Sequence, residues 1–434
     1  MEDNKELGHS PFRDIPDEWK LVPVKYIAPL RTEKSPITGT SISLEQIQSG
    51  TGRLLNTSET VAGDGVLFQN GDILFGKLRP YLAKVYKAES VGHAFGDIIV
   101  FAPSAVVSEF LFFVLISHEF IKEVDHSTYG TKMPRANPEF ICSIRVPIPS
   151  LDEQKSISAF LHYELAKIDA LINEQKRLIE LLKEKRQAVI SHGVTKGLNP
   201  DAPMKDSGVE WLGEVPEHWE LRKVKRLFRL KAEPAPPDND HELLSVYTDI
   251  GVKPRKELEQ KGNKASTTDG YWMVKKGDLI VNKLLAWMGA VGMSDYDGVT
   301  SPAYDVLEQI ETLEPYFYHL LFRNKQTQNE FKRWSRGIME MRLRLYFDQL
   351  GQIYVPFPPL KEQREIVQRI QMIESTYSAL TIEAEKQVKL LTERHSALIS
   401  AAVTGKIDVS DWQPPAGSDK VDSNASVQTE RHYG

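Results

Sequence analysis

The chain is poor in cysteine and in long apolar runs. A single cysteine, Cys142, among 434 residues excludes an internal disulfide framework and a cysteine-based zinc site. The longest apolar candidate, residues 110–116, is far shorter than the roughly 20 residues that span a bilayer. The polar start at Met1 leads into no signal-like segment. These absences predict a protein of a bacterial or archaeal cytoplasm that does not enter a membrane.

Motifs for catalysis are also missing. No Asn-Pro-Pro-Tyr-like loop is present to hold a flipped adenine. Residues 71–77 spell most of a phosphate-binding loop, but Leu78 replaces the Ser or Thr that would hold magnesium, so a turn followed by a strand over 73–75 is the better interpretation. Glu153-Gln154-Lys155 resembles a nuclease motif but is better interpreted as a helix start. The eleven histidines contain no His-x-x-x-His pair. We therefore predict no catalytic residue, no metal ligand and no cofactor bound by this chain.

Length and composition predict a soluble protein of two domains. The chain is 41% hydrophobic and 26% charged, and its length is too great for one ordinary core. A formal net charge of −6 does not indicate nucleic acid binding, but net charge averages over all faces. Local clusters of Lys and Arg are the better guide.

The sequence contains an internal duplication. Residues 146–198 align with residues 355–407 at a constant offset of 209 (355 − 146), and 18 of the 53 positions are identical without a gap. A second echo at an offset of 200 matches the Pro-x-x-Trp of Pro16 and Trp19 with that of Pro216 and Trp219. Two copies of one unit of roughly 200 residues predict a pseudo-symmetric molecule.

Each duplicated segment predicts a helix of about 40 residues, or roughly 60 Å. Apolar residues recur at alternating steps of four and three, the heptad period of a coiled coil. In the second copy Glu374, Thr381, Ala384 and His395 weaken the seam, while Leu380 and Leu390 lie beside it. The predicted pairing seam consists of Leu161, Leu165, Ile168, Ile172, Ile179, Leu182, Val189, Ile370, Tyr377, Val388, Leu391 and Leu398.

Local signals mark where these helices begin and end. The prolines of 146–149 and 355–359 cannot continue a strand ladder or enter a helix, so we expect a stiff extended lead. Asp152, Glu153 and Glu362 then fall in a first turn, where the helix dipole favours carboxylates. Each helix stops near a glycine, Gly197 or Gly405, that can adopt the left-handed cap.

Basic residues gather near aromatic ones outside the helices. Arg222, Lys223, Lys225, Arg226, Arg229 and Lys231 form one cluster, and a second runs from Arg323 to Arg344. Such a run is often only a solvated face, but in a duplicated framework it also fits DNA. The candidate DNA-binding residues are Lys77, Arg79, Tyr81, Lys84, Tyr129, Lys132, Arg135, Lys283, Trp287, Arg333, Arg336, Arg342 and Arg344.

The combination of a proline-rich lead, Leu-x-Glu-Gln, a long helix and a Val-Thr-Gly-like stop, repeated after regions that open with Pro-x-x-Trp, resembles the specificity subunits of type I restriction-modification enzymes (the HsdS family). The resemblance covers Pro16 to Ile407. It implies an α+β fold with two pseudo-repeated mixed α/β target-recognition domains separated by two long antiparallel coiled-coil helices. Each domain would read one half of a bipartite DNA site.

The same resemblance implies the partners. These are double-stranded DNA, methylation subunits, two being expected, and restriction subunits. S-adenosylmethionine, ATP and magnesium would belong to those partners, and this chain would be a non-catalytic recognition subunit. The domain order that follows is a flexible N-terminus at 1–15, the first recognition domain at 16–150, the first spacer helix at 151–198, the second recognition domain at 199–359, the second spacer helix at 360–407, and a disordered tail at 408–434.

The two recognition regions differ in sequence. Residues 21–127 and 221–333 share only fragments, such as Gly71-Asp72 against Gly277-Asp278. A shared scaffold with divergent surfaces predicts two different half-sites. Two other functions fit a duplicated architecture of this kind: a stand-alone DNA-binding regulator, and a coiled-coil scaffold without a nucleic acid role.

Overall fold

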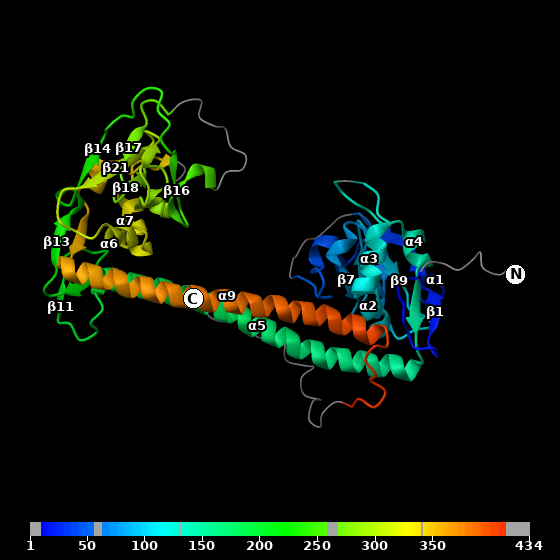
Figure 1. Ribbon diagram of the computed structural model, residues 1–434. Helices are drawn as coiled ribbons and strands as arrows, with labels where there is room; N and C mark the ends of the chain where they lie inside the picture. Colours follow the sequence, from blue (N-terminus) through cyan, green and yellow to red (C-terminus); the bar gives the residue numbers. More distant parts are fainter. Residues whose placement is uncertain (1–9, 56–62, 131, 258–267, 340–341, 414–434) are drawn as a thin grey trace. The chain divides into compact units, whose positions relative to one another are not determined.

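The computed structural model describes residues 10–55, 63–130, 132–257, 268–339 and 342–413. The chain divides into two compact units. Unit 1 comprises Met1–Lys176 and Lys386–Gly434, and unit 2 comprises Arg177–Glu385. Each unit contains one mixed α/β domain and parts of two long helices, α5 (Leu151–Lys196) and α9 (Leu360–Val403) (Figure 1). Among the described residues, no helix has both the length and the apolarity needed to cross a membrane.

Two four-stranded sheets form the domain of unit 1. The first has the order β2-β9-β6-β7, with β2 (Leu30–Arg31), β9 (Ile98–Phe101), β6 (Ile73–Gly76) and β7 (Val85–Lys87). The second has the order β3-β5-β8-β4, with β3 (Lys34–Pro36), β5 (Asp64–Phe68), β8 (Gly92–Ala94) and β4 (Ser41–Ile42). Short helices pack on the first sheet: α1 (Val24–Ile27), α2 (Ser108–Ile116), α3 (His118–His126) and α4 (Pro138–Ser143). Helix α2 is buried on every side from Phe110 to Ile116, which explains its lack of amphipathic period.

Unit 2 repeats the first sheet and its helices. Its order is β14-β21-β18-β19, with β14 (Phe228–Lys231), β21 (Tyr304–Gln309), β18 (Leu279–Asn282) and β19 (Val291–Met293). Two-stranded pieces complete the domain: β15 (Leu244–Tyr247) with β16 (Gly251–Pro254), β17 (Trp272–Val274) with β20 (Gly298–Thr300), and β11 (Met204–Asp206) with β12 (Glu214–Pro216). The helices are α6 (Pro315–Phe322), α7 (Lys325–Trp334) and α8 (Phe347–Leu350). The two domains therefore share one antiparallel four-stranded sheet and the helices that follow its last strand.

Within each unit, the first turns of one long helix pack against the last turns of the other. In unit 1, one core joins the first turns of α5 to the last turns of α9 through Ile157, Leu161, Leu165, Ile399, Ala402 and Val403. In unit 2, one core joins the last turns of α5 to the first turns of α9 through Ile190, Val194, Ile366, Val367 and Ile370. The two helices are therefore antiparallel, and the predicted α+β fold with two mixed domains and two long paired helices is confirmed.

The predicted seam residues lie on the inner side of the pair. Leu161, Leu165, Ile168, Ile179 and Ile370 are buried, and Ile172, Leu182, Val189, Tyr377, Val388, Leu391 and Leu398 are half-buried. Leu380 and Leu390 are instead 49% and 47% exposed, so they do not belong to the packed face. Two polar seam positions on α9 face polar partners on α5, and burial lowers the pKa of His395 so that its ring favours the neutral form. Arg186 contacts Glu374 at 2.6 Å in unit 2, and His395 lies 3.9 Å from Asp169 in unit 1.

The duplicated Glu-Gln motif attaches each domain to a helix start. In unit 1 the Gln154 side chain accepts a hydrogen bond from the Val107 amide at the start of α2 (2.8 Å) and donates one to the Pro149 carbonyl (2.9 Å). In unit 2 Gln363 makes the same two bonds with Glu314 and Pro358, at 2.9 and 2.8 Å. Both glutamines are buried.

Each helix end meets the Pro-x-x-Trp motif of the unit in which it ends. Gly405 at the end of α9 has a φ of +73°, and a Cβ there would lie 2.5 Å from Pro16 and 3.3 Å from the Trp19 ring. Gly197 at the end of α5 has a φ of +78° and the same relation to Trp219 at 3.2 Å. The predicted glycine caps are confirmed, and their lack of a side chain is required by close packing as well as by backbone conformation.

The proline-rich leads differ from the prediction. They form strands: β10 (Arg145–Ile148) pairs antiparallel with β1 (Lys20–Pro23), and β22 (Tyr354–Phe357) pairs with β13 (Glu220–Lys223). Each ladder has only two strands, so the outer edge of each strand needs no partner and a proline is tolerated there. The predicted acidic first turns at Asp152, Glu153 and Glu362 are confirmed.

The predicted termini were also partly wrong. Within the segment predicted to be flexible, Phe12 is 3% exposed and belongs to the core of unit 1. Within the segment predicted to be a disordered tail, Val409 is buried and the Trp412 ring lies 5.7 Å from that of Phe160. These apolar side chains find partners distant in the sequence. Residues 1–9 and 414–434 lie outside the described part of the chain.

Candidate nucleic-acid interface

Both domains carry a loop closed by the same backbone bonds. In unit 1 Tyr129 and Arg135 exchange two backbone hydrogen bonds of 3.3 and 3.2 Å, and in unit 2 Arg336 and Arg344 exchange two of 2.9 Å. The amide of the next residue, Ala136 or Leu345, donates to the carbonyl of Lys77 or Lys283, at 2.9 Å in both units. The two loops are therefore structural equivalents.

We call the surface formed by each loop and the turn beneath it the hairpin face. It unites most of the residues predicted to bind DNA, which come from distant parts of each domain. In unit 1 the hairpin face consists of Lys77, Arg79, Tyr81, Tyr129, Lys132 and Arg135, and in unit 2 of Lys283, Trp287, Arg336, Arg342 and Arg344. Thr131 and residues 340–341 lie outside the described residues.

A short 3-10 turn places an aromatic side chain at the same position in each hairpin face. The turn at Pro80–Leu82 carries Tyr81, which is 54% exposed, and the turn at Ala286–Met288 carries Trp287. The first turn is flanked by Arg79 and Ala83, two non-glycine residues with φ of +50° and +47°. Such strained positions concentrate at functional sites. Exposed aromatic rings and cations are the side chains that contact bases and phosphates.

Charges in the unit 1 hairpin face converge on Asp97. Its carboxylate accepts hydrogen bonds from Arg135 and lies 3.8 Å from the Lys77 ammonium. Tyr129 and Lys132 are exposed. Lys84 was predicted to bind DNA, but its ammonium donates to the Leu44 carbonyl at 2.7 Å and connects two parts of the domain. We therefore leave Lys84 out of the hairpin face.

The unit 2 hairpin face is arranged differently. Lys283 donates to the Pro302 carbonyl at 2.9 Å and pairs with Asp305 at 3.3 Å. Burial raises the pKa of Asp305 above its ordinary value, against the opposing effect of Lys283. The Lys332 ammonium lies 5.1 Å above the Trp287 ring. The two hairpin faces thus share a backbone frame and differ in side chains.

Arg333 lies beside this face and is already paired. Its guanidinium contacts Glu210 at 2.8 Å and Glu330 at 3.6 Å, and its side chain remains 61% exposed. Arg336, Arg342 and Arg344 come from the loop itself, and the Arg344 guanidinium donates to the Arg342 carbonyl at 3.4 Å. DNA binding by these residues stays a prediction.

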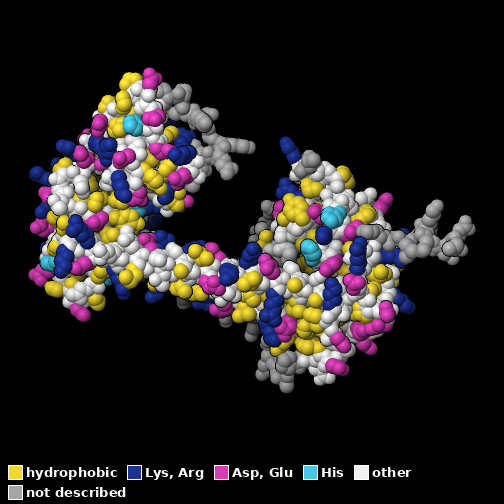
Figure 2. Space-filling view, viewed as in Figure 1, with side chains coloured by type: hydrophobic (Ala, Val, Ile, Leu, Met, Phe, Trp, Pro, Cys, Tyr) yellow, Lys and Arg dark blue, Asp and Glu magenta, His cyan; other side chains and the backbone are white. Residues whose placement is uncertain are grey.

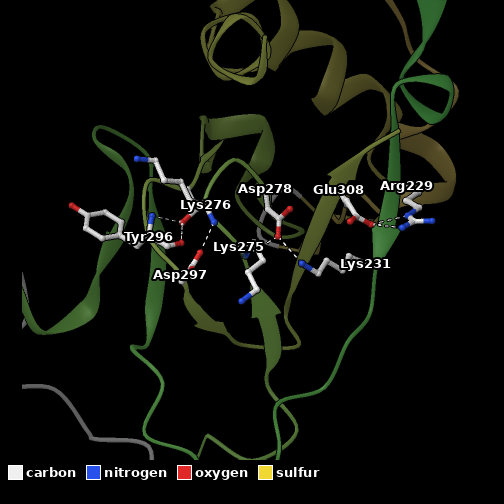
Figure 3. Close-up of polar contacts among 9 residues, drawn as sticks. Arg229, Lys231, Lys275, Lys276, Asp278, Tyr296, Asp297 and Glu308 are labelled. Carbon is white, nitrogen blue, oxygen red and sulfur yellow. Dashed lines mark hydrogen bonds and ion pairs between the residues drawn. The ribbon is translucent and has the colours of Figure 1, made fainter. Parts of the chain in front are cut away.

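Most of the basic cluster from Arg222 to Lys231 is engaged inside unit 2. The Arg222 guanidinium lies 3.9 Å from the centre of the Phe357 ring. Figure 3 shows Arg229 paired with Glu308, at 2.6 Å, and Lys231 paired with Asp278, at 3.0 Å. Lys223 also donates to Gln352 at 3.1 Å. These contacts tie strands together, so these four side chains have partners inside their own domain, and DNA binding by this cluster stays a prediction.

Arg323 is likewise a structural residue rather than part of a DNA-binding run. Its guanidinium donates to the carbonyls of Tyr247, Thr248, Gly289 and Val291, at 2.9–3.3 Å. Its neighbour His319 accepts a hydrogen bond from the Met293 amide at 3.1 Å. Burial, assisted by the Arg323 charge, lowers the pKa of His319 to about 3, so the ring is neutral at ordinary pH.

Acidic and basic side chains alternate over the face of each unit seen in Figure 2. This mixture agrees with the net charge of −6 and means that DNA would have to be held by local groups. Among the residues that the structure describes, no group of His, Cys, Asp and Glu side chains is arranged to hold a metal ion.

Sequence reasoning missed Asp97 and the role of the buried glutamines. Asp97 gave no signal because it lies 38 residues before Arg135. The equivalence of the two hairpin faces is, however, visible in the sequence as a constant offset. The offset of 206 that relates Gly71-Asp72 to Gly277-Asp278 also relates Lys77 to Lys283 and Tyr81 to Trp287.

The fold defines a two-domain protein in which two related hairpin faces carry Lys, Arg and aromatic side chains. Comparison with known families is more specific. The profile of the type I restriction modification DNA specificity domain matches residues 16–181 and again 216–390. The chain therefore belongs to the family of type I restriction-modification DNA specificity subunits.

Curated relatives agree with this assignment. The specificity subunit of the type I restriction enzyme EcoDI of Escherichia coli is 22% identical over 342 residues, which cover 73% of each chain. That of the enzyme MjaVIII of Methanocaldococcus jannaschii is 22% identical over 361 residues, covering 78% of this chain and 77% of the relative.

Solved structures share the fold. A chain from a study of complex assembly and conformational transition of the type I R-M system aligns with a TM-score of 0.67 at 16% identity, covering 91% of this chain and all of the other. The HsdS subunit from Thermoanaerobacter tengcongensis aligns with a TM-score of 0.55 at 16% identity, covering 91% of this chain and 99% of that chain.

Proposed function

We propose that each hairpin face reads one half of an asymmetric, bipartite DNA site. One observation carries this proposal: the same backbone frame is built twice and presents different side chains. Lys77 and Lys283 occupy one equivalent position, and Arg135 and Arg344 another, but their partners differ. A common frame positions a protein on the duplex, while different side chains select different bases. The two half-sites therefore differ in sequence.

The long helices would set the distance between the half-sites and dock the methylation subunits. Exposed apolar side chains support the docking role because solvent-facing apolar clusters mark interaction surfaces. In unit 2 these side chains are Leu178, Leu181, Met372, Leu380 and Ile382, the last being 65% exposed. In unit 1 they are Leu151, Leu171 and Leu390. We expect two methylation subunits, and restriction subunits in the complete complex.

We propose further that this chain recognises DNA without catalysing a reaction and works in the cytoplasm. S-adenosylmethionine, ATP and magnesium would bind the partner subunits. The purified chain should then neither methylate nor cleave DNA, nor hydrolyse ATP. Each assay is repeated with the partner subunits added, and activity in the chain alone would contradict the proposal.

The decisive experiment maps methylated adenines in cells that express the chain with its methylation subunits. We expect a single bipartite motif with two different halves. Replacing Arg342 and Arg344 with Ala should change the second half-site only, if these residues touch bases. If they touch only phosphates, affinity should instead fall evenly across sequences, with a shallower salt dependence. A change in the bases recognised in the first half-site would contradict the proposal that each unit reads its own half-site.

The spacing role has its own test. Inserting one heptad after Lys176 and another after Glu385 preserves the seam and lengthens both helices by about 10 Å. We expect the gap between the half-sites to grow by up to about three base pairs while the letters stay the same. An unchanged gap would show that the helices do not set the spacing. A stand-alone regulator would instead bind its site equally well without methylation subunits.

A further inference from the structure

Arg135 is held from two sides. Its backbone is paired with Tyr129 on one edge and forms a bridge with Leu78 on the other. Its guanidinium meets the Asp97 carboxylate through Nε, at 3.2 Å to both oxygens, and through Nη2, at 3.0 Å to Oδ2. Arg135 side-chain exposure is nevertheless 45%. The residue is therefore rigidly placed and still accessible from solvent.

The geometry of the pair leaves one specific edge of the guanidinium available. A guanidinium has five N–H donors in a planar fork. Asp97 takes the side edge, formed by Nε and one hydrogen of Nη2. The remaining end, formed by Nη1 and the other hydrogen of Nη2, carries two parallel donors. This is the arrangement that donates to O6 and N7 of guanine in the major groove.

A carboxylate on a DNA-binding surface has a cost, because it repels phosphates. Asp97 also lies within 3.8 Å of Lys77, so it stands between two cations of the hairpin face. An ion pair exposed to solvent contributes little to folding stability, because water screens it. Stabilisation of the fold therefore does not explain why Asp97 lies on this surface. Fixing the Arg135 side chain before DNA arrives removes the cost of ordering a long, mobile group at binding.

The second unit lacks this arrangement. The strand pairs Gly76 with Ile98 and Asn282 with Tyr304 place Ala303 where unit 1 has Asp97. Among the described residues, the guanidinium of the equivalent arginine, Arg344, donates to the backbone carbonyl of Arg342 and forms no ion pair with a carboxylate. The nearby carboxylate of Asp305 is directed to Lys283.

We propose that Asp97 is a positioning residue for base recognition, and that it holds Arg135 so that its free end reads a guanine in the half-site bound by unit 1. This inference rests on the proposed function and deepens it. It assigns a sharp guanine preference to the first half-site and none of the same origin to the second.

The test compares variants in the complex with methylation subunits, on DNA libraries in which every base pair of the motif is varied. In Asp97→Asn the residue keeps its size and an acceptor oxygen but loses the charge that orients the guanidinium. We expect one base pair of the first half-site to lose about tenfold or more of its discrimination. Arg135→Lys, which cannot donate two parallel bonds, should lose discrimination at the same base pair.

The pattern of affinity changes across DNA sequences distinguishes this positioning role from a purely electrostatic one. Removing a negative charge should strengthen phosphate binding on every sequence if Asp97 acts only through its charge. A uniform rise in affinity with unchanged letters, or an equal change in both half-sites, would overturn the inference. Glu308→Gln is the matched control, because it breaks an exposed Arg–carboxylate pair away from either hairpin face and should alter no letter.

Failure of the inference can be told apart from failure of the proposed function. If the wild-type complex discriminates no sequence, the proposed function is wrong. If the wild-type complex reads a bipartite site and Asp97→Asn reads it identically, only the inference is wrong. Thermal melting of each variant, compared with wild type, identifies loss of folding, and Arg135→Lys then supplies the result independently of Asp97.

Discussion

Removing the side chain of Gln154 should loosen the first recognition domain from its helix. In Gln154→Ala the Val107 amide loses its acceptor and the Pro149 carbonyl loses its donor. The glutamine is 1% exposed, so water does not readily replace it. A buried polar group left without a partner costs about 1–3 kcal/mol. Two such groups, one of them only half-buried, give an expected loss of about 2–5 kcal/mol in unit 1.

Amide hydrogen exchange measures this loss where it arises. Peptides that cover residues 107–116 should exchange faster in Gln154→Ala, because α2 is no longer tied at its start. The matched variant is Gln363→Ala, which removes the equivalent bonds to Glu314 and Pro358. It should accelerate exchange over 314–322 and leave 107–116 unchanged. Because the chain has two units, local exchange is a better measure than one global melting temperature.

A third variant tests the chemistry of the bond. Gln154→Glu keeps an acceptor for Val107 but places a carboxylate oxygen against the Pro149 carbonyl. We expect it to be at least as disruptive as Ala near neutral pH, and to recover on acidification when the carboxyl regains a donor hydrogen. Unchanged exchange over 107–116 in Gln154→Ala, or equal acceleration in both units, would refute the assignment of this glutamine as the local attachment.

Three further outcomes follow from single contacts. His319 has a pKa of about 3 in the folded protein against an ordinary 6.5, so the unfolded chain binds a proton that the folded chain does not. Unit 2 should therefore lose stability as pH falls below 6.5, by about 2 kcal/mol at pH 5. His319→Gln should flatten this pH dependence in thermal melts, and a pH profile identical to that of wild type would contradict the prediction. In Gly405→Ala the new methyl group meets both a positive φ and a clash with Pro16, whereas Gly213→Ala meets a positive φ in open space. Gly405→Ala should therefore lower the melting temperature of unit 1 more than Gly213→Ala lowers that of unit 2. Equal decreases would argue against the packing role of Gly405. Ile179→Asp buries a charge in the helix pair and should prevent assembly with methylation subunits, which co-purification measures; normal assembly would count against the pairing.

The structure also explains which sequence-based predictions were wrong. Prolines were taken to exclude strands at 146–149 and 355–359, yet both leads form strands because each ladder has a free outer edge. Positive charge was taken as a sign of DNA binding at Arg323, yet its guanidinium is held by four backbone carbonyls of its own domain. A basic residue alone does not reveal whether a carboxylate or carbonyl lies beside it after folding.

The sequence by itself determined the duplication, the two long helices with their starts and stops, and the family resemblance. These features rest on periodicity and on capping residues, which act over a few positions along the chain. Only the tertiary structure decided that the hairpin faces are equivalent, that Asp97 meets Arg135, and that Phe12 lies in a packed core against which Trp412 also packs. The physical reason is distance along the chain: each of these contacts joins residues tens to hundreds of positions apart, and no local pattern specifies which side chain will lie opposite which.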